Sequence, residues 1–214
     1  MAFVVDDIVL FGGLYLAYEG VLWGIGQLAR WRKGKKTEDI RVTPELTEQD
    51  KELIEKCREV MKENFPEGIE ARLKGLDSPD RNAIFQKLVM ELNVVYGVNI
   101  TNIAFLSAEE IGMGTYGYYE RNGNSIRFNC DLIMSDDREV LHAMIDTIFH
   151  EMRHALQYRA VTDSSCNYGT EEQRRLWALN FANYIPAHVD FAFYQEQVVE
   201  ADARQIAELV MNGF

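Results

Sequence analysis

The sequence predicts an α+β fold in which a small, mainly antiparallel sheet packs on one long amphipathic helix, with further helices around them. Three observations lead to this class. Residues 47–63 and 78–96 repeat apolar side chains at helical spacing, residues 98–132 form short β-like runs, and residues 135–159 return to helical spacing. A tight turn between two of the β-like runs makes antiparallel pairing the expected arrangement.

Length and charge divide the protein into an N-terminal appendage and one domain. The 214 residues, 47% of them hydrophobic, suffice for one core, and we assign residues 1–42 to the appendage and 43–214 to the domain. The net charge of −12 disfavours a surface that follows nucleic-acid phosphates, so we expect no nucleic acid as partner. Basic residues gather only in the stretch 30–41.

The appendage contains an apolar segment, residues 8–29, about as long as the ~20 residues that a membrane-spanning helix needs. The basic stretch after it would face the cytoplasm, so we expect a cytoplasmic domain with possible membrane association through residues 8–29. Glu19 lies near the centre of the segment, where a charge costs roughly 2.5–3.5 kcal/mol on an insertion scale. An apolar, glycine-rich helix that packs on protein is an equal alternative.

Two helices are expected before the sheet. The first covers residues 47–63, and the second covers residues 78–96, with Pro79 in its first turn and Gly97 as its stop signal. Each has an apolar face and a charged face, so both are interpreted as structural.

The β-like runs predict about three strands. Ile126, Phe128 and Cys130 alternate with polar residues, and the Asn122-Gly123 dipeptide between two runs is typical of a hairpin turn. We expect the strand around residues 126–129 to form a sheet edge on which an extended peptide docks by strand addition.

The strongest functional signal is the HExxH motif HEMRH at residues 150–154, inside the helix expected to begin at the N-cap Ser135. Residues four apart lie on one helix face, so His150 and His154 can bind one Zn²⁺ while Glu151 points at the water of that metal. The apolar residues of the helix fall on the opposite side. Two exposed histidines on an amphipathic helix are the alternative, which the intervening glutamate disfavours.

A catalytic zinc needs a third protein ligand. His142 lies on a flank of the same helix, and His188 is isolated in a loop-like stretch. The helix expected over residues 193–211 offers two carboxylates, Glu196 and Glu200. Asp202 falls on the apolar side of this helix and is expected to have a buried partner, which could be an arginine, an amide or a ligand histidine.

Residues 124–207 resemble the small gluzincin metallopeptidases, in which a second helix reading roughly Tyr-x-x-Gln/Pro-x-Glu-x-Asp-Ala follows HExxH. The resemblance implies a zincin-like fold and Glu200 as third zinc ligand, while Glu196 remains the alternative. The thermolysin-like ExxxD spacing is not kept, because residue 204 is arginine. The matching residues are Tyr194, Gln197, Glu200, Asp202 and Ala203, with two residues and not one between Gln197 and Glu200.

The expected function is therefore a zinc metallopeptidase that acts on peptide or protein substrates. Zn²⁺ held by His150, His154 and Glu200 would activate water, and Glu151 would be the general base. The alternative is a proteolytically inert zinc-binding or membrane-tethered interaction module of the toxin or effector kind. Candidate hydrogen-bond donors to the transition state are Tyr184, Tyr194 and His188.

Overall fold

The structure is a computed structural model that describes residues 45–214, so the apolar segment 8–29 and the basic stretch after it lie outside the described residues. The described part is α+β and mostly helical, with a mixed three-stranded sheet. None of the helices in this part is long and apolar enough to cross a membrane. In sequence order the elements are α2 (Glu48–Asn64), α3 (Ile69–Leu73), α4 (Ser78–Tyr96), β1 (Asn102–Leu106), α5 (Ala108–Ile111), β2 (Gly117–Glu120), β3 (Ser125–Asn129), α6 (Cys130–Ile133), α7 (Arg138–Thr162), α8 (Glu171–Ala182), α9 (Phe191–Glu196) and α10 (Val198–Met211).

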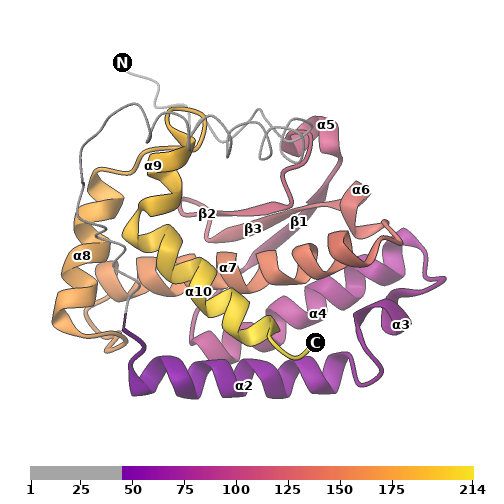
Figure 1. The fold of residues 1–214 in the computed structure, drawn as a ribbon, viewed down its shortest axis with the longest axis horizontal. Helices are drawn as coiled ribbons and strands as arrows, with labels where there is room; N and C mark the ends of the chain where they lie inside the picture. The colour runs from indigo at the N-terminus through magenta and orange to yellow at the C-terminus, as the bar shows by residue number, and fades with distance from the viewer. Residues whose placement is uncertain (1–44) are drawn as a thin grey trace, which may run out of the picture.

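Helix α7 runs through the middle of the molecule. In Figure 1 the sheet lies above it, α4 and α2 lie below it, and α10 crosses it, in agreement with the contacts of α7 with β2, α4 and α10. Buried apolar side chains of α2, α4, α7, α10 and β3 form one core. The long helix therefore has one side in the core and another side toward β2 and α10.

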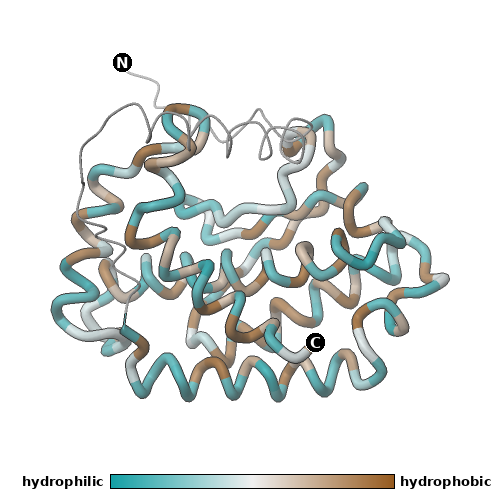
Figure 2. The backbone as a smooth tube through the Cα atoms, viewed as in Figure 1, coloured by the Kyte–Doolittle hydropathy of each residue, from teal (hydrophilic) through white to brown (hydrophobic). Residues whose placement is uncertain are grey.

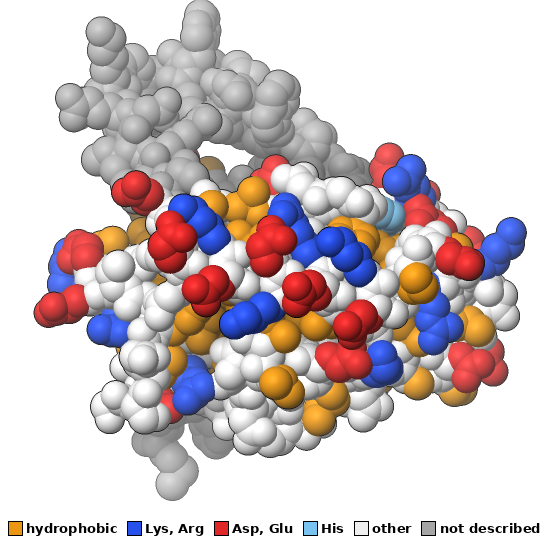
Figure 3. All heavy atoms as spheres, turned by 90° about the horizontal axis from the view of Figure 1, so that it is seen from below, with side chains coloured by type: hydrophobic (Ala, Val, Ile, Leu, Met, Phe, Trp, Pro, Cys, Tyr) orange, Lys and Arg blue, Asp and Glu red, His pale blue; other side chains and the backbone are white. Residues whose placement is uncertain are grey.

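The two predicted helices before the sheet are confirmed. Helix α2 starts with a capping box, because Thr47 and Asp50 each accept a hydrogen bond from the backbone N–H of the other. Helix α4 is capped by Asp77 and ends at Gly97, whose φ of 63° is a left-handed conformation that favours glycine. Hydrophobic and hydrophilic stretches alternate along α2 in Figure 2. Figure 3 shows the face that carries this helix, where acidic and basic side chains are interspersed.

The start of α7 differs from the prediction. Asp137, not Ser135, caps the helix, by accepting hydrogen bonds from the N–H groups of Glu139 and Val140. The backbone carbonyl of Ser135 instead accepts a hydrogen bond of 2.7 Å from the buried Arg81. This tertiary contact holds Ser135 in the turn before the helix.

The sheet has three strands, as expected, but it is mixed and not mainly antiparallel. Its order is β1-β3-β2, with β3 parallel to β1 and antiparallel to β2. The strand at residues 126–129 is therefore central, so the expectation that it forms the sheet edge was wrong. The hairpin turn spans four residues, and Asn124 (φ 43°) takes the left-handed conformation.

The C-terminal region contains two features that the sequence did not predict. Helix α8 was not expected, and the helix expected over residues 193–211 is two helices separated at Gln197. Gln197 has an extended backbone (φ −61°, ψ 139°), and its side-chain amide bonds both the N–H and the carbonyl of Ile185. The break places Glu200 in the first turn of α10, where the helix dipole favours a negative charge.

Candidate metal centre

Three predicted ligands converge between α7 and α10. The Nε2 atoms of His150 and His154 lie 3.0 Å apart. Glu200 Oε2 lies 3.2 Å from His150 Nε2, and Glu200 Oε1 lies 3.4 Å from His154 Nε2. The two histidines lie together for a local reason, because they are four residues apart on α7. Glu200 joins them through a tertiary contact, because α10 crosses α7 here.

The Glu200 carboxylate is held in a buried position. Its side chain is 1% exposed, and the hydroxyl of Tyr184 donates a hydrogen bond of 2.7 Å to Oε1. The other oxygen, Oε2, is buried without a hydrogen-bond partner among the described residues. Its nearest polar contact is His150 Nε2 at 3.2 Å, and a cation at the point where the two imidazoles meet would give this buried oxygen a positive partner.

His154 and Glu200 shift each other's pKa. Burial disfavours the charged form of His154, but Glu200 outweighs burial and raises the pKa of His154 to about 9. Burial likewise disfavours the Glu200 carboxylate, yet His154 and His150 hold its pKa well below the usual range. The raised pKa means that His154 holds a proton next to Glu200, and a metal cation bound at this cluster would replace that proton.

The orientation of His154 is fixed by Gln157 on the next turn of α7. Gln157 Nε2 donates to the carbonyl of Val199 at 3.0 Å and to Asp202 Oδ2 at 2.5 Å, and both of these groups can only accept. The opposite atom, Oε1, must therefore be the acceptor that lies 2.9 Å from His154 Nδ1. Nδ1 therefore carries a hydrogen, and Nε2, which faces Glu200, is the nitrogen that can bind a metal after it loses its proton.

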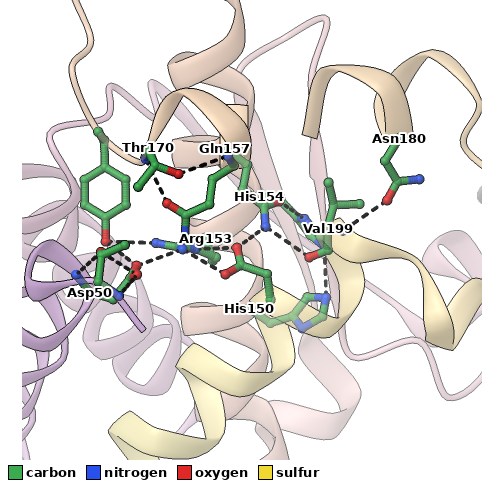
Figure 4. A network of polar contacts seen from close by, with 12 residues as sticks. Asp50, His150, Arg153, His154, Gln157, Thr170, Asn180 and Val199 are labelled. Atoms are coloured by element: carbon green, nitrogen blue, oxygen red, sulfur yellow. Dashed lines mark hydrogen bonds and ion pairs between the residues drawn. The ribbon is translucent and has the colours of Figure 1, made fainter. Parts of the chain in front are cut away.

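Behind Gln157 lies a buried ion network centred on Arg153, which is 0% exposed. The guanidinium donates two hydrogen bonds to Asp202, at 2.8 and 2.9 Å, and its Nη2 lies 2.9 Å from Asp50 Oδ1. Tyr168 links the same groups, since it accepts from Arg153 and donates to Asp50. Figure 4 shows this network, from Asp50 on α2 through Arg153 and Gln157 to the two histidines.

Glu151 lies beside the cluster and contacts the edge strand β2. The N–H of Tyr119, at the free edge of this strand, donates a hydrogen bond of 2.8 Å to Glu151 Oε2. Gly117 allows this approach, because a Cβ there would lie 2.8 Å from the carbonyl of Arg127 and 3.2 Å from Thr147 Cγ2 on α7. Burial raises the pKa of Glu151, and the nearby His150 and His154 partly offset the rise.

The structure separates the remaining candidates. Glu196 is exposed on α9 and is not part of the cluster, so the alternative third ligand is not brought to the site. His142 lies 3.3 Å from Glu70, and His188 is exposed. Of the candidate donors, Tyr184 donates a hydrogen bond to Glu200. The Tyr194 ring packs edge to face on the Tyr184 ring, with the two centroids 6.2 Å apart.

Asp202 has a buried arginine and a buried amide as partners, as predicted. Gln157, Arg153 and the Tyr119 N–H were not predicted as parts of the site. Gln157 could have been found, because it stands three residues after His154 on the same helix and so faces it.

The donor set fits zinc. Two imidazole nitrogens and one carboxylate are the protein ligands of one class of catalytic zinc site. Donor atoms about 2.0–2.1 Å from a tetrahedral zinc lie roughly 3.3 Å apart. The two Nε2 atoms are 3.0 Å apart, and each lies 3.2 or 3.4 Å from a different oxygen of Glu200, all close to this value. One ligand atom from each of the three residues lies within 4.8 Å of the other two. The buried Glu200 Oε2, which has no hydrogen bond among the described residues and lies 3.2 Å from His150 Nε2, supports the same conclusion.

Comparison of the sequence and structure with protein-family models, with curated proteins and with solved structures found no significant match.

Proposed function

We propose that this protein is a zinc-dependent metallopeptidase with a zincin-like fold. The observation that carries the proposal is the convergence of His150, His154 and Glu200 beside Glu151 at the free edge of β2. Three ligands alone are compatible with a structural metal site. A buried carboxylate that lies next to them and is not itself a ligand favours hydrolysis.

The arrangement around α7 supports the zincin-like assignment. The edge strand β2 runs antiparallel to β3, packs on α7 and ends near the cluster. An extended peptide can add to such an edge through its backbone, by pairing with groups of β2 other than the Tyr119 N–H, which is bonded to Glu151. Docking on β2 replaces the docking on residues 126–129 that the sequence suggested.

Zinc bound at the cluster would supply a Lewis acid that polarises the scissile carbonyl and lowers the pKa of water. Glu151 takes the proton of the attacking water and passes it to the leaving amine. Its Oε2 is fixed by the Tyr119 N–H, so Oε1 is the atom that carries the proton. Burial raises the pKa of Glu151, which makes the carboxylate a stronger base.

The test is the zinc content of the purified protein, by elemental analysis, for the wild type and four variants. We expect about one zinc per molecule in the wild type and in Glu151→Gln, and loss of zinc in His150→Ala and Glu200→Ala. Glu196→Ala is the matched control, because Glu196 is the same residue type on the preceding helix but is exposed. It should keep its zinc.

Hydrolysis is measured with a degenerate library of internally quenched peptides. Cleavage by the zinc-loaded wild type and its loss in zinc-loaded Glu151→Gln would support the proposal. Zinc binding without cleavage by the wild type would favour an inert zinc-binding module. A zinc-supplemented wild type without bound zinc would refute both.

A further inference from the structure

A cavity of about 470 Å³ lies next to the candidate metal centre, between the end of β2 and the C-terminal half of α7. Tyr119 and Arg121 line it from the β2 side, Tyr158 and Arg159 line it from α7, and the loop 97–99 closes another side. Tyr119 is also the residue whose N–H holds Glu151. The cavity is therefore a neighbour of the proposed general base.

Aromatic side chains link this cavity with the metal ligands. The Arg121 guanidinium lies over the rings of Phe181 and Tyr184, at 5.5 and 5.9 Å from their centroids. Tyr158 packs edge to face on Phe181 at 6.0 Å, and the Tyr184 hydroxyl bonds Glu200. One continuous wall thus runs from the cavity to the third ligand.

Arg121 is a charge of the cavity without an ion-pair partner among residues 45–214. Arg159 forms an ion pair of 3.1 Å with Asp163, which also lines the cavity. Arg121 has no carboxylate partner among the described residues, and its guanidinium lies over the two rings. A cation–π contact does not use up the N–H donors of the guanidinium, so they can still bind a carboxylate in the cavity.

The position of Arg121 relative to Glu151 suits a peptide. Arg121 directly follows β2 and lies two residues after Tyr119, a distance of about 7 Å along an extended backbone. A peptide that pairs antiparallel with the edge of β2 passes Arg121 before it reaches Glu151. A side chain one or two residues before the reacting carbonyl would enter the cavity.

We propose that this cavity binds a carboxylate of the substrate through Arg121, so that the substrates are acidic peptides. The choice of a peptide as ligand rests on the proposed function. The carboxylate comes from an acidic side chain when the peptide lies antiparallel to β2, and from the free C-terminus of the peptide when it lies in the opposite direction. A protein with a net charge of −12 repels acidic ligands at long range, so a local cation is needed to bind one.

The experiment measures peptide binding to the full-length Glu151→Gln protein by fluorescence anisotropy. The probes are three labelled octapeptide libraries that differ in one feature. The first library has glutamate at one fixed position and an amidated C-terminus. The second has glutamine at that position and an amidated C-terminus, so it is neutral there. The third has glutamine at that position and a free C-terminal carboxylate. Each titration is run with zinc and again with a chelator.

We expect one of the two carboxylate libraries to bind about tenfold more tightly than the neutral library, as for one charge-assisted hydrogen-bonded pair. The preference should disappear when Arg121→Gln is added and persist in part with Arg121→Lys. Arg175→Gln is the matched control, since it removes an equal charge from an exposed position on α8. It should keep the preference.

Which carboxylate library binds identifies the source of the carboxylate. Equal binding of all three libraries, or no binding, overturns the proposal, and so does a preference that survives Arg121→Gln. A preference that vanishes with the chelator means that the metal holds the carboxylate, and this also overturns it. A preference that persists with the chelator supports the cavity even if the zinc or cleavage tests fail.

Discussion

Replacing Gln157 by leucine removes the acceptor that holds the Nδ1–H of His154 and leaves the packing volume nearly unchanged. The imidazole then loses the contact that directs Nε2 toward Glu200. Loss of such a supporting contact typically lowers metal affinity by roughly 10–100-fold, or about 1.4–2.7 kcal/mol. The metal ligands themselves are untouched.

The same substitution also costs stability, for a separate reason. Asp202 and the Val199 carbonyl each lose a donor, although Asp202 keeps Arg153. We expect the free energy of unfolding of the zinc-free protein to fall by about 1–3 kcal/mol.

Gln157→Glu separates the two effects. It keeps an oxygen acceptor for His154 but places a second carboxylate against Asp202, so it should retain zinc affinity while lowering the free energy of unfolding. Zinc affinity is measured by competition with a chelator, and stability by urea unfolding of the zinc-free proteins. Wild-type zinc affinity in Gln157→Leu would refute the orienting role of the amide. Equal losses of affinity in both variants would attribute the effect to packing.

Three further predictions concern the groups around this site. Asp202→Ala leaves Arg153 buried with Asp50 as its remaining carboxylate partner, and should lower the free energy of unfolding by about 3–5 kcal/mol in urea titrations; a loss below about 1 kcal/mol would contradict a structural role. In the zinc-free protein Glu200 raises the pKa of His154 from an ordinary 6.5 to about 9. The contribution of the His154–Glu200 pair to the free energy of unfolding is therefore complete below pH 6.5 and is lost as the pH rises toward 9. The melting temperature should fall over this window in the wild type and not in Glu200→Gln, and equal pH profiles would exclude the pair as the cause. Tyr184→Phe removes the donor to Glu200 Oε1 and should weaken zinc binding roughly 3–10-fold, as chelator competition would show; an unchanged affinity would mean that the hydroxyl does not position this ligand.

Features set by neighbouring residues could be predicted from the sequence. Helices α2 and α4 follow from helical spacing and from caps at Thr47 and Gly97. The facing positions of His150 and His154 follow from the four-residue period. The prediction of Glu200 as third ligand rested on a resemblance to a family. In the structure Glu200, and not Glu196, lies at the two histidines.

Features set by distant contacts could not be predicted. The helix break at Gln197 depends on the bonds of its side chain to Ile185, and the parallel pairing of β3 with β1 is not encoded in the hairpin turn. Likewise, Ser135 has a good capping side chain, but Arg81 holds its carbonyl outside the helix. In each case a tertiary contact outweighs a local preference of a few tenths to about 1 kcal/mol.

The Arg153 network also bears on how the protein is made. Its partners come from α2 and α10, which are separated by most of the described sequence, and Glu200 lies on the same late helix. During synthesis, Arg153 and Gln157 emerge from the ribosome before Asp202 exists to pair with them. The metal centre can therefore assemble only after α10 has been synthesised and docked, and a nascent polypeptide stopped before it would have an arginine that lacks Asp202, a two-histidine half site and an uncovered side of α7.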